Sequence, residues 1–547
     1  MPHARKILVA VAWPYAQGPL HLGHLAGAYL PSDIFARYHR AKGNDVLMVS
    51  GSDVHGTPIT VKADEEGITP EEVVNRYHPE FLWYWDTLGI AFDLFTTTGT
   101  ATHTRVAQEF FLTLLDNGYL YRKTVDQFFD EQEGRFLPDR YIEGTCPHCG
   151  FDRARGDQCD NCGRTLDPID LIAPHSKLSG LPPVLRNTEH YYWRLSAVQE
   201  PLLEWLRTRR GWRPHVVNFA VGMVDEGLHD RAFTRDLEWG IPLPVDDLGP
   251  GKSIYVWWEA VMGYFSAPQE WAERRGDPGA WRAWWQDPAA ESYYFVGKDN
   301  IPFHAVYWPA LLLGHGGLNL PTDVPANQYV TFGGQKASKS RGVGRSLRWY
   351  LERIQPDALR YAVAINLPET NDTDLSDEQL VRRINDELVA TWGNLVNRVV
   401  AMTHRYCGGL APEPGEEDAV DAALRGSVAA GFDEVGGHIE AVRLRAGLGA
   451  AMALAQAANV YLSERQPWKT ATTDPARTAT TLVVALDTVA GIATMLAPYL
   501  PFTSAAVAAA LGVEGAERRW EQPVIVPGQR LGEAVPLFAK LEPLDEE

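Results

Sequence analysis

Two histidines at the start of a predicted helix are the first side chains along the chain that could do chemistry. Residues 7–13 form a continuous apolar run, typical of a strand buried on both faces of a parallel sheet. A turn rich in proline and glycine follows, and then come His21, Gly23 and His24. Free N–H groups and the positive end of the dipole at a helix start bind phosphate, and Gly23 leaves room for a flat base. Taken alone, the pattern is more simply explained as two surface histidines.

A second candidate is the segment FGGQKASKSRG, in which Lys336, Ser338 and Lys339 lie between glycines. The flanking glycines predict a loop. Two lysines and two hydroxyl groups in such a loop could contact a polyphosphate. Taken alone, the segment could also be a solvated basic loop.

Acidic side chains follow two of the predicted strands. Asp53 comes shortly after the apolar strand 45–51, and Asp299 follows the strand that begins at Ser292. Polar residues at the carboxyl ends of parallel strands are where such sheets bind their ligands. Asp53 is therefore a candidate for binding an ammonium group. The alternative is a helix N-cap ahead of the following segment, a role that aspartate often takes.

Four of the five cysteines fall in one cluster, with the spacing CxxC, nine residues, CxxC. The residues are Cys146, Cys149, Cys159 and Cys162, and a glycine follows each pair. Four thiolates at this spacing form a tetrahedral zinc site, which is structural because no ligand position remains for water. A disulfide framework is the alternative, but a cytosolic chain disfavours it. His148 could replace one sulfur, although knuckles of this kind normally use both cysteines.

Length and composition limit the remaining possibilities. With 547 residues, 45% hydrophobic and 22% charged, the chain predicts a globular protein of two to four domains. A formal net charge of −20 argues against non-specific nucleic-acid binding, so an RNA partner would need local basic patches. No apolar run approaches the length of a membrane span, and the N-terminus leads directly into a strand. We therefore expect a cytoplasmic protein that does not bind membranes.

The elements that must position these residues divide the chain into an α/β part and an all-α part. Strands within 253–265 and 292–304 are interpreted as the second half of a doubly wound sheet. Between the halves, the chain from Tyr119 looks short, irregular and turn-rich, and residues 189–210 predict an amphipathic helix. From Ser376 onward, apolar residues recur every three or four positions, which predicts a helix bundle.

Three polar or aromatic residues of the predicted bundle lie away from its apolar stripe or in a predicted loop. Asn394 and Arg398 lie four positions apart, away from the apolar stripe of their helix. Trp468 follows a proline in a predicted loop, where it could stack on a base or simply staple the bundle. Most such polar pairs are solvated surface, and that alternative remains open here.

Together these motifs resemble the methionyl-tRNA synthetase family of class I aminoacyl-tRNA synthetases along nearly the whole chain. The segments that carry the resemblance are AWPYAQGPLHLGH, SDVHGTP, LPDRYIEGTCPHC, CDNC, FTRDLEWGIP, YVWWEAVMGY, FVGKDNIPFH, KASKSRG and RQPW. The distance between the HLGH and KASKS segments leaves little room for the large editing domain of the leucyl, isoleucyl and valyl enzymes. Three alternatives remain: a synthetase for another small apolar amino acid, an inactive tRNA-binding paralogue, and a nucleotidyltransferase without a tRNA partner.

The resemblance implies a fold and an order of domains. The fold is a class I doubly wound, Rossmann-type parallel sheet with a zinc-knuckle insertion and a C-terminal all-α anticodon-binding bundle. The implied units are the catalytic first half (1–118), the connective insertion with the zinc knuckle (119–232), the catalytic second half (233–325), a stem-contact module with the KASKS loop (326–375) and the anticodon-binding domain (376–547).

The resemblance also implies the reaction and its partners. The activity would be ATP-dependent ligation of L-methionine to tRNA(Met), the initiator included, through a methionyl-adenylate, with release of AMP and pyrophosphate. This reaction supports initiation and elongation of translation. The implied cofactors are one structural zinc ion and Mg²⁺ with ATP, and the implied state is a monomer.

Finally, the resemblance assigns residues to three groups. For methionine they are Trp13, Tyr15, Asp53, Trp257, Val261, Tyr264, Asn300 and His304. For ATP they are His21, Gly23, His24, Lys298, Asp299, Lys336, Ser338 and Lys339, of which His21, His24, Lys336 and Lys339 act in catalysis together with Arg235. For the CAU anticodon they are Asn394, Arg398 and Trp468. Of these implications, the shape of the methionine pocket is the one that the resemblance supports least. The chain departs from the best-known bacterial pattern at Trp13, Val261, Asn300 and Ala337.

Overall fold

A parallel five-stranded sheet forms the centre of the N-terminal half, with its strands in the order β14-β13-β1-β2-β3. The computed structural model describes residues 4–332, 335–336, 344–534 and 536–544. The strands are β1 (Lys6–Val11), β2 (Asp45–Ser52), β3 (Leu94–Thr97), β13 (Glu291–Gly297) and β14 (Ala326–Asn327). The strand order changes direction at β1, so the carboxyl ends of β1 and β13 form the crevice where such sheets bind ligands.

Helices cover both faces of this sheet, as the continuous apolar run in β1 predicts. Ile7, Val9 and Val11 pack into one core, and Leu8 and Ala10 pack into the other. The first face carries α1 (Leu22–His24), a π-helical segment (Leu25–Tyr29), α2 (Leu30–Ala41), α3 (Thr57–Glu66) and α4 (Pro70–Leu88). The second face carries α5 (Ala101–Asp116), α6 (Gln199–Arg207), α7 (Pro214–Asp225), α8 (Val256–Arg274), α9 (Arg282–Trp285) and α10 (Trp308–His315).

The insertion is built on a long antiparallel pair that the sequence analysis did not predict. β4 (Leu120–Asp130) pairs with β9 (Val184–Trp193) from Leu120↔Trp193 to Phe129↔Val184. The irregular structure expected from Tyr119 and the helix expected to begin at residue 189 are therefore both wrong. Tyr191 and Trp193 are buried at the two-residue spacing of a strand, and pairing with β4 overrides the local helical period. Within the expected helix, a 3-10 turn (Leu195–Val198) and α6 are helical.

Short strands complete the insertion and the segments around it. The insertion sheet adds β5 (Arg135–Phe136) and β10 (Arg231–Ala232), and the cysteine region contains β6 (Ile142–Thr145), β7 (Ala154–Arg155) and β8 (Ile172–Ser176). The remaining strands are β11 (Thr234–Arg235), β12 (Ser253–Ile254), β15 (Val330–Phe332), β16 (Gln335–Lys336) and β17 (Thr373–Asp374). β12 pairs with β11 rather than joining the central sheet.

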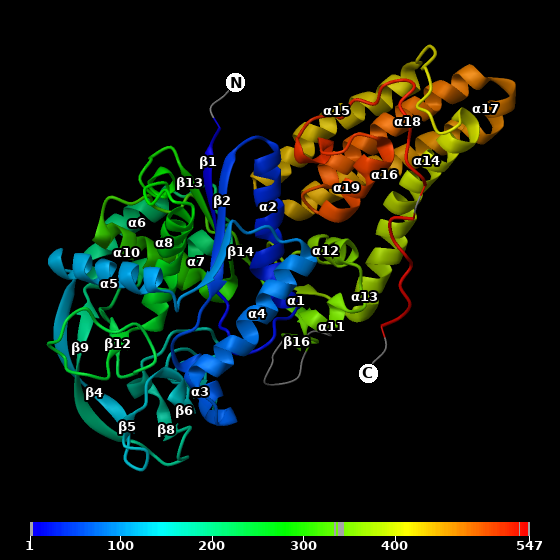
Figure 1. Cartoon of the computed structure of the whole chain (residues 1–547). Coiled ribbons are helices and arrows are strands. Elements are labelled where there is room, and N and C mark those ends of the chain that lie inside the picture. The colour runs from blue at the N-terminus through cyan, green and yellow to red at the C-terminus, as the bar shows by residue number, and fades with distance from the viewer. Residues whose placement is uncertain (1–3, 333–334, 337–343, 535, 545–547) are drawn as a thin grey trace.

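The C-terminal bundle lies on the opposite side of the central sheet from the insertion (Figure 1). Along the chain, α11 (Leu347–Leu351) and α12 (Pro356–Ala364) lie between the last strand of the central sheet and the bundle. Ser376 caps α13 (Asp377–Arg382), which continues through a π-helical segment (Arg383–Gly393) into α14 (Asn394–Cys407). The other helices are α15 (Ala419–Glu440), α16 (Leu444–Arg465), α17 (Pro467–Thr473), α18 (Pro475–Leu496) and α19 (Pro501–Leu511). The predicted apolar stripe is buried in this bundle, for example at Leu388 and Trp392.

Among the described residues, one helix is long and apolar enough to cross a membrane by length and composition alone. α18 has 22 residues, and its most apolar window is 89% buried inside the bundle. That burial is the pattern of a core helix packed on its neighbours.

Candidate active site

Two hydrogen bonds link the two histidines and the glycine of the HLGH turn, on the carboxyl side of β1. His21 is the N-cap of α1: its Nδ1 accepts from the Gly23 N–H at 3.1 Å, and the His21 N–H donates to His24 Nδ1 at 3.2 Å. Because both Nδ1 atoms accept, the proton of each neutral ring is on Nε2. A Cβ on Gly23 would lie 2.8 Å from the His21 ring, so any larger residue at this position would displace that ring.

The segment that follows KASKS lies beside these histidines. The Leu347 N–H donates to the Leu20 carbonyl at 2.7 Å, and Ser346 forms a β-bridge with His21. Upstream of KASKS, the backbone of Lys336 pairs with Thr331 in β15. Ser338 and Lys339 lie outside the described residues.

Asp53 is buried at the end of β2, in the crevice of the sheet. It is only 3% exposed, forms a β-bridge with Tyr15, and accepts from the His55 N–H at 3.3 Å. Burial, and then the neighbouring Glu259 carboxylate, raises the pKa of Asp53 well above its usual range. The N-cap alternative is wrong, since α3 begins after Gly56 and not after Asp53.

Aromatic rings form the walls next to Asp53. Trp13 contacts Tyr264 edge-on with ring centroids 6.3 Å apart, and Tyr15 contacts Trp257 at 6.1 Å. Trp257 also stacks on Phe303 at 3.9 Å, a wall residue that the sequence analysis missed although it lies within the quoted GKDNIPFH segment.

Two glycines explain how the chain accommodates Trp13. A Cβ on Gly51 would lie 2.1 Å from the Trp13 ring, and one on Gly263 would lie 2.7 Å from it. The indole therefore fills space that any side chain at these two positions would occupy. Val261, another departure from the familiar pattern, is buried on α8, one turn from Tyr264.

His304 lies behind the rings in a fixed tautomer. Its Nδ1–H donates to the Asn300 carbonyl at 2.9 Å, so its Nε2 accepts from the Tyr264 hydroxyl at 2.7 Å. Burial lowers the pKa of His304 to about 4, so the ring is neutral at pH 7. Asn300 thus contributes its backbone carbonyl to the arrangement.

A buried network behind Asp53 was not predicted. Glu259 is fully buried, and its two carboxylate oxygens accept from His55 Nδ1 at 2.9 Å and from His103 Nε2 at 2.7 Å. His55 belongs to the SDVHGTP segment, but nothing in the local sequence pairs it with two residues more than 45 positions away.

The remaining charged candidates lie at two separate edges of the site. After β13, Lys298 forms an ion pair with Asp372 at 2.7 Å and lies 3.6 Å from the centre of the Tyr329 ring, whose hydroxyl donates to Asp299. Arg235 lies on the side of the insertion, and its guanidinium packs over the Tyr255 ring.

Arg235 lies in a charged and aromatic environment. Its Nε is 3.3 Å from Asp139, and although burial alone would lower it, the pKa of Arg235 is raised because Asp139 and Tyr255 favour the charged form. It lines a cavity of about 610 Å³ between the insertion and the core, together with Trp257 and Phe303.

The four clustered cysteines converge on one point. Their Sγ atoms all lie within 4.8 Å of one another, a donor set that could hold a metal ion. Cys146 and Cys162 are 4.0 Å apart at sulfur, and Cys149 and Cys159 are 3.6 Å apart, far longer than a disulfide bond. All four are free thiols, so the disulfide alternative is wrong.

The three anticodon candidates share one face of the bundle. Asn394 is exposed on α14, one turn before Arg398, and the Arg398 guanidinium lies 5.6 Å from the centre of the Trp468 ring. Trp468 is 41% exposed. The loop expected around it is wrong, because Pro467 begins α17 and Trp468 belongs to its first turn, where proline is well tolerated.

Two family models match the chain and together cover most of it. The one described as tRNA synthetases class I (M) matches residues 7–400, and the one described as anticodon binding domain of methionyl tRNA ligase matches residues 411–542. The chain belongs to the methionyl-tRNA synthetase family. The predicted resemblance and fold class are thereby confirmed.

Individual members of the family match the chain from end to end. It is 50% identical to the methionine–tRNA ligase of Roseiflexus sp. (strain RS-1), covering 98% of this chain and 97% of that one. It is 51% identical to the ligase of Thermomicrobium roseum, covering 96% and 89%. The Mycobacterium tuberculosis methionyl-tRNA synthetase in complex with methionyl-adenylate superposes with a TM-score of 0.82 at 27% identity, covering 97% of this chain and 99% of that one.

Membership of the methionyl-tRNA synthetase family weakens the alternatives raised by the sequence. A nucleotidyltransferase without a tRNA partner does not account for a matched anticodon-binding domain. A synthetase for another apolar amino acid does not account for full-length matches to methionine–tRNA ligases at about half identity.

Proposed function

We propose that this chain ligates L-methionine to tRNA(Met), the initiator included, at the expense of ATP. The observation that carries the proposal is a buried carboxylate, Asp53, beside aromatic walls at the carboxyl end of the central strands, close to the HLGH turn. In the first step a methionine carboxylate oxygen attacks the α-phosphorus of ATP and pyrophosphate leaves. In the second step a hydroxyl of the terminal ribose attacks the adenylate carbonyl and AMP leaves.

The proposed amino-acid site combines one charge with several rings. Asp53 binds the ammonium group, and its raised pKa makes the carboxylate form depend on a cationic partner. Trp13, Trp257, Tyr264 and the other aromatic side chains pack against the thioether, which is flexible and polarizable. Val261, Asn300 and His304 support these rings from behind.

The proposed ATP site needs no protein nucleophile, because positioning and charge stabilisation carry such chemistry. The residues assigned to it are His21, Gly23, His24, Lys298, Asp299, Lys336, Ser338 and Lys339. His21, His24, Arg235, Lys336 and Lys339 stabilise the charge that develops at the α-phosphate, and Mg²⁺ accompanies ATP.

We further propose that Cys146, Cys149, Cys159 and Cys162 bind one zinc ion. Four thiolates within 4.8 Å of one another suit tetrahedral zinc, and leave no position for water. The ion would be structural, and its ligands tie the two cysteine turns of the insertion together.

Asn394, Arg398 and Trp468 are proposed to bind the anticodon, where an arginine and an asparagine can read base edges and an indole can stack on a base. The five units predicted from the sequence, with boundaries at 118, 232, 325 and 375, describe this division of labour. We propose a monomer that works in the cytoplasm and does not bind membranes.

The test is a pair of assays on the purified protein. Pyrophosphate exchange without tRNA measures adenylate formation with each of the twenty amino acids, and aminoacylation measures transfer to tRNA. We expect methionine to support exchange far better than leucine or isoleucine, and only tRNA(Met) to be charged. Exchange supported by another amino acid, or none at all, would contradict the proposal.

A further inference from the structure

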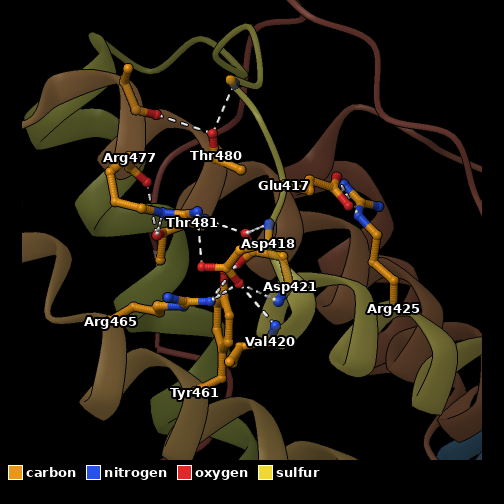
Figure 2. Close-up of polar contacts among 12 residues, drawn as sticks. Glu417, Asp418, Val420, Asp421, Arg425, Tyr461, Arg465, Arg477, Thr480 and Thr481 are labelled. Carbon is orange, nitrogen blue, oxygen red and sulfur yellow. Dashed lines mark hydrogen bonds and ion pairs between the residues drawn. The ribbon is translucent and has the colours of Figure 1, made fainter.

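The short helix α17, which carries Trp468, is held between two arginines of its neighbouring helices. Arg465 is the last residue of α16, and Arg477 lies in the first turn of α18. Both side chains reach the same two carboxylates, Asp418 and Asp421, at the start of α15 (Figure 2). The residues that precede and follow α17 are therefore both held by the same pair of carboxylates at the start of α15.

Asp421 is the centre of this arrangement, and its side chain is fully buried. Arg477 Nη2 lies 2.6 Å from Oδ2, and Arg465 Nη2 lies 3.3 Å from Oδ1. The Tyr461 hydroxyl donates to Oδ1 at 2.7 Å, and the Asp418 N–H donates to Oδ2 at 3.0 Å. Oδ2 thus accepts two hydrogen bonds, and Oδ1 accepts one from Tyr461 and forms an ion pair with Arg465, which together stabilise the buried charge.

Asp418 joins the same cluster from the N-cap of α15. It accepts from the backbone N–H groups of Val420 and Asp421, forms an ion pair with Arg465, and lies 3.7 Å from Arg477 Nη1. Hydrogen bonding by Arg465, followed by the two backbone donors, lowers the pKa of Asp418 to about 2.

One side-chain hydrogen bond joins α17 directly to α18, between the Thr470 and Thr478 hydroxyls at 2.6 Å. Within α17 only Pro467 is buried, and Gln466 just before it has φ +48°, a left-handed conformation that non-glycine residues rarely adopt. Such a conformation persists only where the surroundings determine it. The ion pairs of Arg465 and Arg477 act on both sides of this corner, since Gln466 directly follows Arg465.

We propose that Asp421 is a positioning residue for anticodon recognition. Through Arg465 and Arg477 it fixes α17 so that Trp468 stands beside Arg398, ready to stack on an unpaired base. This inference rests on the proposed role of Trp468 and Arg398 in binding the anticodon. Asp421 itself, being buried, does not touch the RNA.

The test compares Asp421→Asn, Trp468→Ala and the double variant in aminoacylation and in pyrophosphate exchange. Asparagine keeps the shape of the side chain but removes the charge that both arginines share. We expect Asp421→Asn to raise the KM for tRNA(Met) about tenfold, a part of what one stacked base contributes, and to leave exchange within about twofold of wild type. Because Asp421 acts through Trp468, the double variant should lose no more than Trp468→Ala alone.

A matched control removes a different ion pair from the same bundle. Asp487 accepts from Arg425 at 2.5 Å, joining α15 to α18 away from the ends of α17. We expect Asp487→Asn to leave the tRNA KM unchanged. Should Asp421→Asn not fold, Arg477→Lys keeps the charge but loses the forked contact with the two carboxylates and the Nε–H donor to Thr481. A smaller rise in KM with unchanged exchange is then expected.

Each outcome decides the matter. If Trp468→Ala raises the tRNA KM but Asp421→Asn does not, the positioning role is overturned and the anticodon site survives. If the losses of the single variants multiply in the double variant, or if exchange falls as well, Asp421 is a general stabilising residue and the inference is wrong. If Trp468→Ala itself has no effect on tRNA, the anticodon assignment fails and the inference fails with it.

Discussion

At the scale of single residues, the proposed role of Asp53 in binding the methionine ammonium group can be tested. Its burial near Glu259 favours the protonated form, whereas an ammonium partner favours the carboxylate. We expect Asp53→Asn to lower kcat/KM for methionine by a factor of about 10² or more, since removing one partner of a buried pair costs about 3–5 kcal/mol. Pyrophosphate exchange at varied methionine concentration measures this loss.

The KM for ATP supplies the control for Asp53→Asn. It should stay within about threefold of wild type, because the proposed contact is to methionine alone. An equal rise in both KM values would mean that the substitution disturbs the crevice rather than the ammonium site.

His304 gives a prediction about stability and pH. Burial lowers its pKa to about 4 in the folded protein, whereas an unfolded histidine titrates near pH 6.5. Between these values the unfolded state binds a proton and the folded state does not, so this term lowers stability as the pH falls from about 6.5 to about 4. Its full size is about 3 kcal/mol, at 1.36 kcal/mol per pKa unit.

Unfolding free energies of wild type and His304→Gln, measured from pH 7.5 to pH 4.5, isolate this contribution. The variant should be less stable at pH 7.5 but should lose less stability on acidification. Parallel curves would show that other buried groups, such as His39, account for the acid sensitivity.

The residues of the site differ in how far the sequence could predict them. Asp53 is a candidate because of its position after a strand, whereas Trp257 is implied only by the family resemblance. The Glu259, His55 and His103 network does not, because its hydrogen bonds join three elements that are distant along the chain. Contacts of that kind depend on how helices pack, which no local spacing reports.

At the scale of elements, the cysteine turns give a prediction about metal. If the four sulfurs bind one ion, metal analysis should find about one zinc per chain, and Cys159→Ser should lose it. Because the proposed ion would connect the two cysteine turns of the insertion, we expect the variant to unfold at a lower temperature and to charge tRNA more slowly. Cys407→Ser is the matched control: this half-buried thiol ends α14, outside the cluster, and its loss should leave the zinc content unchanged. A metal-free protein with unchanged unfolding and charging would refute the structural role.

The sequence predicts helices, strands and turns well where their pattern lies within a few neighbouring residues, and poorly where they depend on partners far along the chain. The apolar run of β1, the cap at Ser376 and the cysteine spacing all act within a few residues, and the structure has the expected strand, helix start and sulfur cluster. β9 was mistaken for a helix because its partner β4 lies more than 50 residues away along the chain. Trp468 was assigned to a loop because a proline precedes it, although proline also begins helices.

At the scale of the whole molecule, the sheet and the bundle share one hydrophobic core. The same cluster contains Ile7 of β1, Tyr38 of α2, Trp392 of the π-helical segment between α13 and α14, and Tyr499 after α18. The sequence predicted separate units and could not predict this continuity, because each apolar stripe shows only that a helix buries a face. Which neighbour covers that face is decided by the tertiary arrangement.

Arg360 of α12 is the polar centre of this junction and is fully buried. Its guanidinium donates to Asp33 of α2 at 2.7 Å, to the Leu88 carbonyl of α4 at 3.1 Å, and to the Pro498 and Tyr499 carbonyls after α18 at 2.9 and 2.7 Å. Although burial alone would raise the pKa of Asp33, it is lowered because Arg37 and Arg360 both favour the carboxylate. One side chain therefore links the sheet domain to the bundle.

We expect Arg360→Met to destabilise the protein by about 3–5 kcal/mol, since Asp33 stays buried with half of its charge partners removed and three carbonyls lose a donor. The junction also joins the domain of the proposed adenylate site to the bundle that carries the proposed anticodon face. Aminoacylation should therefore fall more than pyrophosphate exchange, and unfolding curves together with both assays measure the two effects.

Arg37→Met is the matched control: it removes the half-buried partner of the same carboxylate, 2.8 Å away, without touching the bundle carbonyls. If the two variants change stability and the ratio of the two activities equally, the contact with the bundle contributes nothing and Arg360 serves only to neutralise Asp33.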